Sequence, residues 1–99
     1  MAVAYMYQIP QSGEEYHRTV GEIFTGTPPP GLLIHSAGTG DDGSFYIVEV
    51  WEDEDAMTRF GDEVVVPSLK RHHIDTSAAQ RTRIQVEYLI GPAAALAGA

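Results

Sequence analysis

Two short runs of branched and aromatic residues, joined by a stretch rich in glycine and aspartate, constrain the fold of this chain most strongly. The first run covers residues 31–37, the second covers residues 44–51, and residues 38–43 lie between them. Branched and aromatic side chains favour β-strands, whereas glycine and aspartate favour tight turns. The pattern therefore predicts a β-hairpin in the middle of the chain.

A strand and a helix are predicted before the hairpin. Residues 2–8 alternate small and large side chains at period two, which is typical of a strand with one crowded face. Ser12 and Glu15 have the spacing of a capping box, which starts a helix. The apolar face at helical spacing, expected to pack on the sheet, consists of Tyr16, Val20, Ile23 and Phe24.

A second helix is predicted directly after the hairpin. Asp53 is a candidate N-cap, and the acidic residues around it suit a helix N-terminus. Proline lacks an amide hydrogen and disturbs a helix interior. Pro67 therefore predicts a kink or a break near Val66, followed by a separate last turn over residues 68–72. The buried stripe of the helix is formed by Ala56, Phe60 and Val64.

The order of the elements predicts the fold. Residues 82–90 alternate polar and apolar side chains over most of their length. This pattern indicates a final strand with one face on the core and the other in a more polar environment. Strand, helix, strand, strand, helix, strand is the ferredoxin-like βαββαβ arrangement of the α+β class, with a four-stranded antiparallel sheet. Residues 1–92 would form one domain, and residues 93–99 a frayed C-terminal tail.

A homodimer is expected from this architecture. Both helices cover the same face of the sheet, so the other face must meet solvent or another subunit. A domain of 99 residues buries a limited fraction of its surface and gains stability from association. Two copies would pack sheet against sheet and form an α/β barrel with a cavity.

Charge and composition exclude several classes of partner. The chain has 14 acidic and 6 basic residues and a formal net charge of -8, which repels nucleic acids and anionic membrane surfaces. It contains no cysteine, which excludes disulfides and thiolate nucleophiles. No apolar stretch approaches the ~20 residues that cross a membrane, and the N-terminus lacks a signal-peptide pattern. We expect a cytoplasmic protein.

His35 and Glu49 are the candidate catalytic residues. A carboxylate within an apolar strand needs solvent, a partner or a lined cavity. With the hairpin centred near Asp41, His35 would lie on the same face as Glu49 and across the sheet from it, as a base oriented by an acid. Slipping the register by one residue would separate them. The alternatives are a core histidine, and an ion pair between Glu49 and Arg83 or Lys70.

Aromatic side chains are the candidate substrate-binding residues. Trp51 would stack on an aromatic substrate, or simply pack at the end of its strand. Strand tyrosines would donate hydrogen bonds to a phenolate or quinone oxygen, or pack in the core. No metal is expected, because His72 and His73 are adjacent and point apart. A metal site would need the fold to bring together His17, His35, Glu49 and one of these two histidines. The candidate substrate-binding residues are Trp51, Tyr5, Tyr7, Tyr88 and His72.

Two motifs carry a family resemblance that covers about residues 2–90. They are Gly31-Leu32-Leu33-Ile34-His35 and Val48-Glu49-Val50-Trp51-Glu52-Asp53, followed by Ala56 and Phe60. The chain resembles the dimeric α/β-barrel superfamily that includes the antibiotic biosynthesis monooxygenases, and in particular its small actinobacterial members. The resemblance implies a substrate pocket and, for some members, oxygenation of polycyclic phenols without metal, flavin or any other cofactor.

The haem-degrading branch of that superfamily is disfavoured. Its members use an asparagine on the first strand, a tryptophan within the second helix and a histidine near the end of that helix. This chain contains no asparagine, has Phe60 in place of the tryptophan, and offers only His72 or His73 as the histidine.

We therefore expect a cofactor-independent monooxygenase that acts on a small aromatic or polyketide-type metabolite. A base, His35 assisted by Glu49, would deprotonate the substrate so that it reacts with dioxygen. A polyketide cyclase or isomerase would use the same base without oxygen. A non-catalytic protein that binds a small molecule or haem is the third alternative.

Overall fold

The computed structural model describes residues 1–9, 13–24, 26–75, 77–92 and 94, apart from the side chain of Glu15. The capping box predicted for Ser12 and Glu15 lies outside the described residues. The predicted frayed tail at residues 93–99 also lies outside them, except for residue 94.

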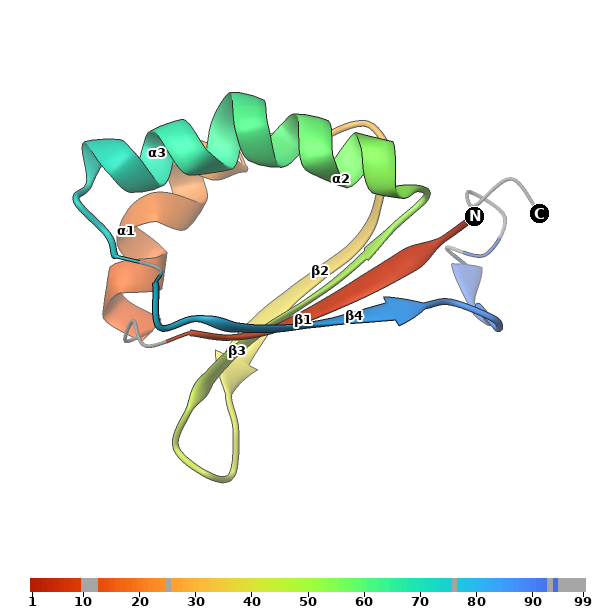
Figure 1. Ribbon diagram of the computed structural model, residues 1–99, viewed down its shortest axis with the longest axis horizontal. Coiled ribbons are helices and arrows are strands. Elements are labelled where there is room, and N and C mark those ends of the chain that lie inside the picture. The colour runs from red at the N-terminus through yellow and green to blue at the C-terminus, as the bar shows by residue number, and fades with distance from the viewer. Residues whose placement is uncertain (10–12, 25, 76, 93, 95–99) are drawn as a thin grey trace.

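The chain forms the βαββαβ arrangement expected from its sequence (Figure 1). The four strands make one antiparallel sheet in the order β2-β3-β1-β4. The fold is therefore ferredoxin-like, of the α+β class. In chain order the elements are β1 (Val3–Ile9), α1 (Gly13–Ile23), β2 (Leu32–Thr39), β3 (Phe45–Trp51), α2 (Glu54–Phe60), the π-helical segment η1 (Gly61–Val65), α3 (Val66–Arg71) and β4 (Gln80–Gln85).

All three α-helices lie on one side of the sheet (Figure 1). Beneath α2, the core is formed by the fully buried Val3, Tyr5 and Trp51, against which Ala56 and Phe60 pack. A Cβ atom built on Gly31 would come within 2.6 Å of the Ala56 Cβ. Gly31 therefore lies close to α2. Its backbone φ of +88° also favours glycine. This cluster of buried residues therefore lies at the α2 end of the sheet.

The predicted hairpin is confirmed, and its register places His35 opposite Glu49. Thr39 pairs with Phe45 at the end of the ladder, so the hairpin centres on Asp42. A shift in register between Leu32 and Ile34 marks a β-bulge near the start of β2. Because side chains alternate between the two faces, His35, Glu49 and Trp51 all point toward the helices.

The second helix begins as predicted but is not broken near Val66. The Asp53 side chain accepts a hydrogen bond of 2.8 Å from the backbone N–H of Ala56, which is the expected N-cap. Instead of a break, the chain widens into η1 and continues as α3, with the Val66 N–H donating to the Gly61 carbonyl. Pro67 then falls in the first turn of α3, directly after η1, so the change from π-helical to α-helical hydrogen bonding lies next to the residue that lacks an N–H.

The last strand is shorter than predicted and starts earlier. We expected residues 82–90, but β4 covers Gln80–Gln85. It pairs only with β1, whose Val3 lies opposite Gln85. Because β1 begins at Val3 and the Val86 N–H already donates to the Ala2 carbonyl, no strand lies beside the residues that follow. The alternation over residues 86–90 therefore has no sheet to join.

The sheet face opposite the helices is uncovered and partly apolar. Register places Ala4, Val50 and Ile34 in one row across it, with Met6 and Val48 in the next. The large apolar side chains exposed there are Met6, Ile34, Val48 and Ile84.

None of the helices formed by the described residues combines the length and the apolar character needed to cross a membrane.

Candidate active site

A cavity of about 470 Å³ lies between the sheet and the helical layer. It occupies the part of the sheet that the α2 core leaves free. Strands β1, β2, β3 and β4 form its floor, and α1, the end of α2, η1 and α3 contribute its walls. Its lining is mainly apolar, with polar groups contributed by Tyr7, Tyr16, Thr19, His35, Glu49, Trp51 and Arg81.

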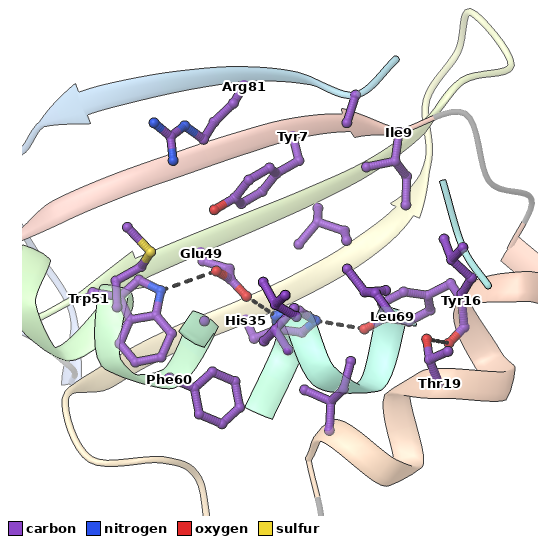
Figure 2. A pocket seen from close by; sticks show the side chains of 18 residues that line it. Tyr7, Ile9, Tyr16, Thr19, His35, Glu49, Trp51, Phe60, Leu69 and Arg81 are labelled. Atoms are coloured by element: carbon purple, nitrogen blue, oxygen red, sulfur yellow. Dashed lines mark hydrogen bonds and ion pairs between the residues drawn. The ribbon is translucent and has the colours of Figure 1, made fainter. Parts of the chain in front are cut away.

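His35 and Glu49 form a hydrogen-bonded pair on the cavity floor (Figure 2). The His35 Nδ1 atom lies 2.8 Å from Glu49 Oε2, and the two side chains are only 16% and 13% exposed. The other carboxylate oxygen of Glu49 accepts a hydrogen bond of 3.1 Å from the Trp51 indole N–H. Both oxygens of this buried carboxylate are therefore satisfied, and neither of the predicted cationic partners, Arg83 or Lys70, is among them.

Tyr16 completes this chain of contacts from the opposite layer. Its hydroxyl lies 2.6 Å from His35 Nε2, so a residue of α1 reaches a residue of β2 across the cavity (Figure 2). The Thr19 hydroxyl donates to the backbone carbonyl of Tyr16. Burial, and then the negative charge of Glu49, raise the pKa of Tyr16 above its usual value. Tyr16 therefore keeps its proton at neutral pH.

Aromatic rings surround the imidazole and the indole. The ring of Phe24 lies 4.5 Å from that of His35, and the ring of Phe60 lies 5.5 Å from that of Phe24. Phe60 also contacts Trp51, with 5.7 Å between the ring centroids. These contacts restrict the orientation of His35 and provide flat apolar surfaces for an aromatic ligand.

Tyr7 and Arg81 provide polar groups on the β1 and β4 side of the cavity (Figure 2). Burial, and then the nearby charge of Glu49, raise the pKa of Tyr7 to about 12, and the positive charge of Arg81 offsets part of this rise. The Arg81 guanidinium lies 5.2 Å from the centroid of the Tyr5 ring, a cation–π contact that orients it. A neutral phenol and a cation can together hold an oxygen atom that carries negative charge.

Four of the predicted site residues line this cavity, namely His35, Glu49, Trp51 and Tyr7. The other three lie elsewhere. Tyr5 is fully buried beneath α2, where its hydroxyl donates to Glu54. Tyr88 is 86% exposed beyond the end of β4. His72 contacts Glu22, with 2.6 Å between Nε2 and Oε2, and so links α3 to α1.

Three polar lining residues were not predicted as site residues, namely Tyr16, Thr19 and Arg81. Tyr16 was predicted to lie on the buried face of its helix. That face does point toward the sheet, but at Tyr16 it covers the cavity and not the core. Arg81 lies just before the strand predicted at residues 82–90, whereas β4 already begins at Gln80. Alternation within β4 puts Arg81 on the helix side, opposite Tyr7 in the register.

Among the described residues, no group of three or more histidine, cysteine, aspartate or glutamate side chains is arranged to hold a metal ion. The site instead combines a carboxylate, an imidazole and a phenol in series. Such a series can accept a proton from a ligand, hold it on the imidazole beside the carboxylate, and return it.

Comparison with solved structures shows the same fold in several proteins. A candidate antibiotic biosynthesis monooxygenase from Deinococcus radiodurans matches with a TM-score of 0.65 and 16% identity, over 92% of this chain and 97% of its own. A variant of SnoaB, a cofactor-independent oxygenase from Streptomyces nogalater, matches with a TM-score of 0.59 and 16% identity, over 90% of this chain and 94% of its own.

A heme-degrading protein from Mycobacterium tuberculosis has the fold as well. It matches with a TM-score of 0.58 and 15% identity, over 92% of this chain and 100% of its own. No protein-family model matches the sequence, and no curated protein matches it. The chain therefore shares the ferredoxin-like fold of the antibiotic biosynthesis monooxygenase type, a fold whose known structures include a cofactor-independent oxygenase and a heme-degrading protein.

Proposed function

We propose that this protein is a cofactor-independent monooxygenase, of the antibiotic biosynthesis type, that acts on a small aromatic or polyketide-type molecule. The observation that carries the proposal is the Glu49–His35 pair on the floor of a mainly apolar cavity. A base held by a carboxylate in such a cavity suits proton removal from a weakly acidic, apolar substrate. The fold shared with SnoaB, a cofactor-independent oxygenase, supports the same activity.

The chemistry starts with proton transfer to His35 Nε2. Glu49 stabilises the resulting imidazolium at Nδ1. The substrate is a phenol, or a carbon acid made more acidic by a phenol group in the same molecule. Its anion is a carbanion-like ring, which transfers one electron to dioxygen. The two radicals combine to a peroxide anion, which takes back the proton. Loss of water from the hydroperoxide leaves a carbonyl group, so one oxygen atom enters the product and the other leaves as water.

The lining suits a flat substrate with an oxygen at one end. Phe60, with the buried Trp51 packed against it, provides an apolar contact surface for a ring. The Tyr7 hydroxyl, whose pKa is raised to about 12, is protonated at neutral pH and can donate a hydrogen bond. With Arg81 beside it, it would stabilise the negative charge that develops on the substrate oxygen.

Haem fits the donors of this cavity poorly. His35 is the only imidazole among the described residues that line it. Glu49 and Tyr16 occupy its two ring nitrogens, so neither nitrogen is free to bind iron. We assign no step of the reaction to haem.

We also propose that the protein is a homodimer. The uncovered sheet face exposes four large apolar side chains on adjacent strands, and burying them against a second copy removes that surface from water. The dimeric barrel implied by the sequence resemblance uses the same face.

Oxygen consumption tests the proposed activity. We expect dioxygen uptake with dithranol, a tricyclic phenolic anthrone, and a fall of about 100-fold or more in rate for His35→Ala, which is the usual contribution of a general base. An oxygen electrode measures the rate, and circular dichroism checks folding. His35→Gln, which preserves the size of the side chain, provides a second test if the alanine variant is unstable.

His73→Asn is a matched control, because His73 is exposed, has a positive φ that asparagine tolerates, and lies outside the cavity lining. It should keep the full rate. Full activity in folded His35 variants would refute the assigned base. Conversion of the anthrone to its enol tautomer without oxygen uptake would support an isomerase instead.

A further inference from the structure

Tyr16 occupies the nitrogen of His35 that the proposed reaction needs. An ionised carboxylate only accepts hydrogen bonds, so the contact with Glu49 requires a proton on His35 Nδ1. The neutral imidazole then has its lone pair on Nε2, 2.6 Å from the Tyr16 hydroxyl. Tyr16 therefore donates to His35, and in this arrangement no lone pair of the imidazole faces a substrate.

Aromatic rings restrict access to His35 Nε2. The Tyr16 and His35 rings are nearly parallel, with an interplanar angle of 8° and centroids 6.1 Å apart, so the short contact runs along the ring edges. Phe24 covers the imidazole at 4.5 Å. Tyr16 is in turn held by Phe45, whose ring lies 5.2 Å away. The hydroxyl of Tyr16 thus occupies the Nε2 edge of the imidazole, and both residues line the cavity.

We propose that Tyr16 is a catalytic residue that relays the substrate proton to His35, an inference that rests on the proposed function. As the Tyr16 oxygen accepts a proton from the substrate, its own proton passes to His35 Nε2. The products of this step are a substrate anion, a neutral tyrosine and an imidazolium paired with Glu49, so charge and protons balance. The reverse transfer supplies the proton that the peroxide anion needs later.

The relay explains why a phenol with a raised pKa serves here. A free tyrosinate is disfavoured in this site, so the two proton transfers must be coupled. Tyr16 remains neutral before and after the step, and the charge it would otherwise carry resides on the imidazole beside a carboxylate.

Hydrogen exchange without oxygen tests the relay separately from oxygenation. Under anaerobic conditions in deuterated buffer, we expect the wild-type protein to accelerate exchange of the acidic methylene hydrogens of dithranol, followed by proton NMR. Tyr16→Phe should slow the catalysed exchange about 100-fold, with little change in the half-saturating anthrone concentration. This substitution keeps the ring that packs on Phe45 and so should preserve the fold.

Tyr46→Phe is the matched control. Tyr46 bonds to Asp42 in the hairpin turn and lies outside this cavity, so its loss should leave the exchange rate unchanged. If Tyr16 merely blocked a base that acts directly, Tyr16→Phe would exchange as fast as wild type or faster, and that result would overturn the relay.

The tautomer of His35 provides a readout that needs no substrate. Nitrogen NMR of protein labelled at histidine should show neutral His35 protonated at Nδ1, with an Nε2 resonance that shifts in Tyr16→Phe but not in Tyr46→Phe. Protonation at Nε2 would overturn the relay, whether or not dithranol reacts.

Exchange without oxygen uptake would support the relay and refute the oxygenase. If dithranol neither exchanges nor consumes oxygen, the proposed activity on anthrones fails and the tautomer decides the relay geometry.

Discussion

Glu49 is held by two donors, and this allows a carboxylate to remain in a strand at 13% exposure. The His35 imidazole contacts one oxygen and the Trp51 indole donates to the other. Without them, a desolvated carboxylate would be costly to bury. The same negative charge acts on both cavity tyrosines and helps to keep each of them neutral.

Tyr7 should ionise only at an unusually high pH. Because burial and the charge of Glu49 raise its pKa to about 12 from 10.0, Tyr7→Phe should remove a tyrosinate absorption change near pH 12 from the titration of the folded protein. In denaturant the same substitution should remove an ionisation near 10.0, the unperturbed value. An ultraviolet difference titration measures both. Loss of an ionisation near the unperturbed value in the folded protein would contradict the assigned environment.

The sign of this shift also gives a pH dependence of stability. A folded pKa above the unfolded value means that the folded state favours the neutral phenol. The stability that Tyr7 contributes is complete below pH 10.0 and is lost as the pH rises toward about 12.

The residues on the cavity floor could be predicted from the sequence only in part. Alternation in β3 and the hairpin register place His35 and Glu49 on one face, and both follow from local pattern. Tyr5 and Tyr7 share that face and cannot be distinguished by alternation, because what differs is the helix above them. Tyr5 lies under α2, and Tyr7 borders the cavity. The contact of Tyr16 with His35 depends on the packing of α1, which a strand pattern does not encode.

At the scale of elements, a cluster of charges ties the first helix to the third. Glu22 of α1 contacts both Arg71 and His72 at the end of α3. The hydrogen bond from His72, and then the bond from Arg71, lower the pKa of Glu22 to about 2. Because α1 and α3 both wall the cavity, this cluster holds two of its walls together.

Glu22→Gln should lower the melting temperature at neutral pH. The folded pKa of Glu22, about 2, lies below its unperturbed value of 4.5. The carboxylate therefore contributes stability above pH 4.5, and this contribution is lost as the pH falls toward 2. The difference in melting temperature between wild type and variant, measured by circular dichroism, should shrink over that interval. A difference that stays constant down to pH 2 would contradict the assignment.

The sequence predicted which elements form more accurately than how they end. The N-cap of α2 depends on Asp53 and its neighbours, so local chemistry was sufficient. The effect of Pro67 depends on how the helix absorbs it, and η1 does so without a break. The end of β4 depends on where β1 begins, a partner distant in sequence.

For the whole molecule, the uncovered sheet face is the largest consequence of placing every helix on one side. It presents Met6 and Val48 side by side on the two central strands, where their exposed fractions are 41% and 40%. A domain of 99 residues gains from covering this face. In the proposed homodimer, the second copy covers it.

Val48→Lys should convert the homodimer into a monomer. A lysine in the centre of the face places a charge where the proposed interface is apolar, and burying an unpaired charge is strongly unfavourable. Analytical ultracentrifugation measures the mass. Thr58→Lys, on an exposed position of α2, is the control and should remain dimeric. A wild-type protein that sediments as a monomer, or a dimeric Val48→Lys variant, would contradict the proposed interface.

The bond between the Trp51 indole and Glu49 has a practical consequence. Trp51 is the only tryptophan in the chain, it is 1% exposed, and its ring borders the cavity. All tryptophan emission from this protein therefore originates one hydrogen bond from the candidate acid–base pair. The chain carries a built-in fluorophore at its own site, so the arrival of a ligand can be followed in the unmodified protein without a label.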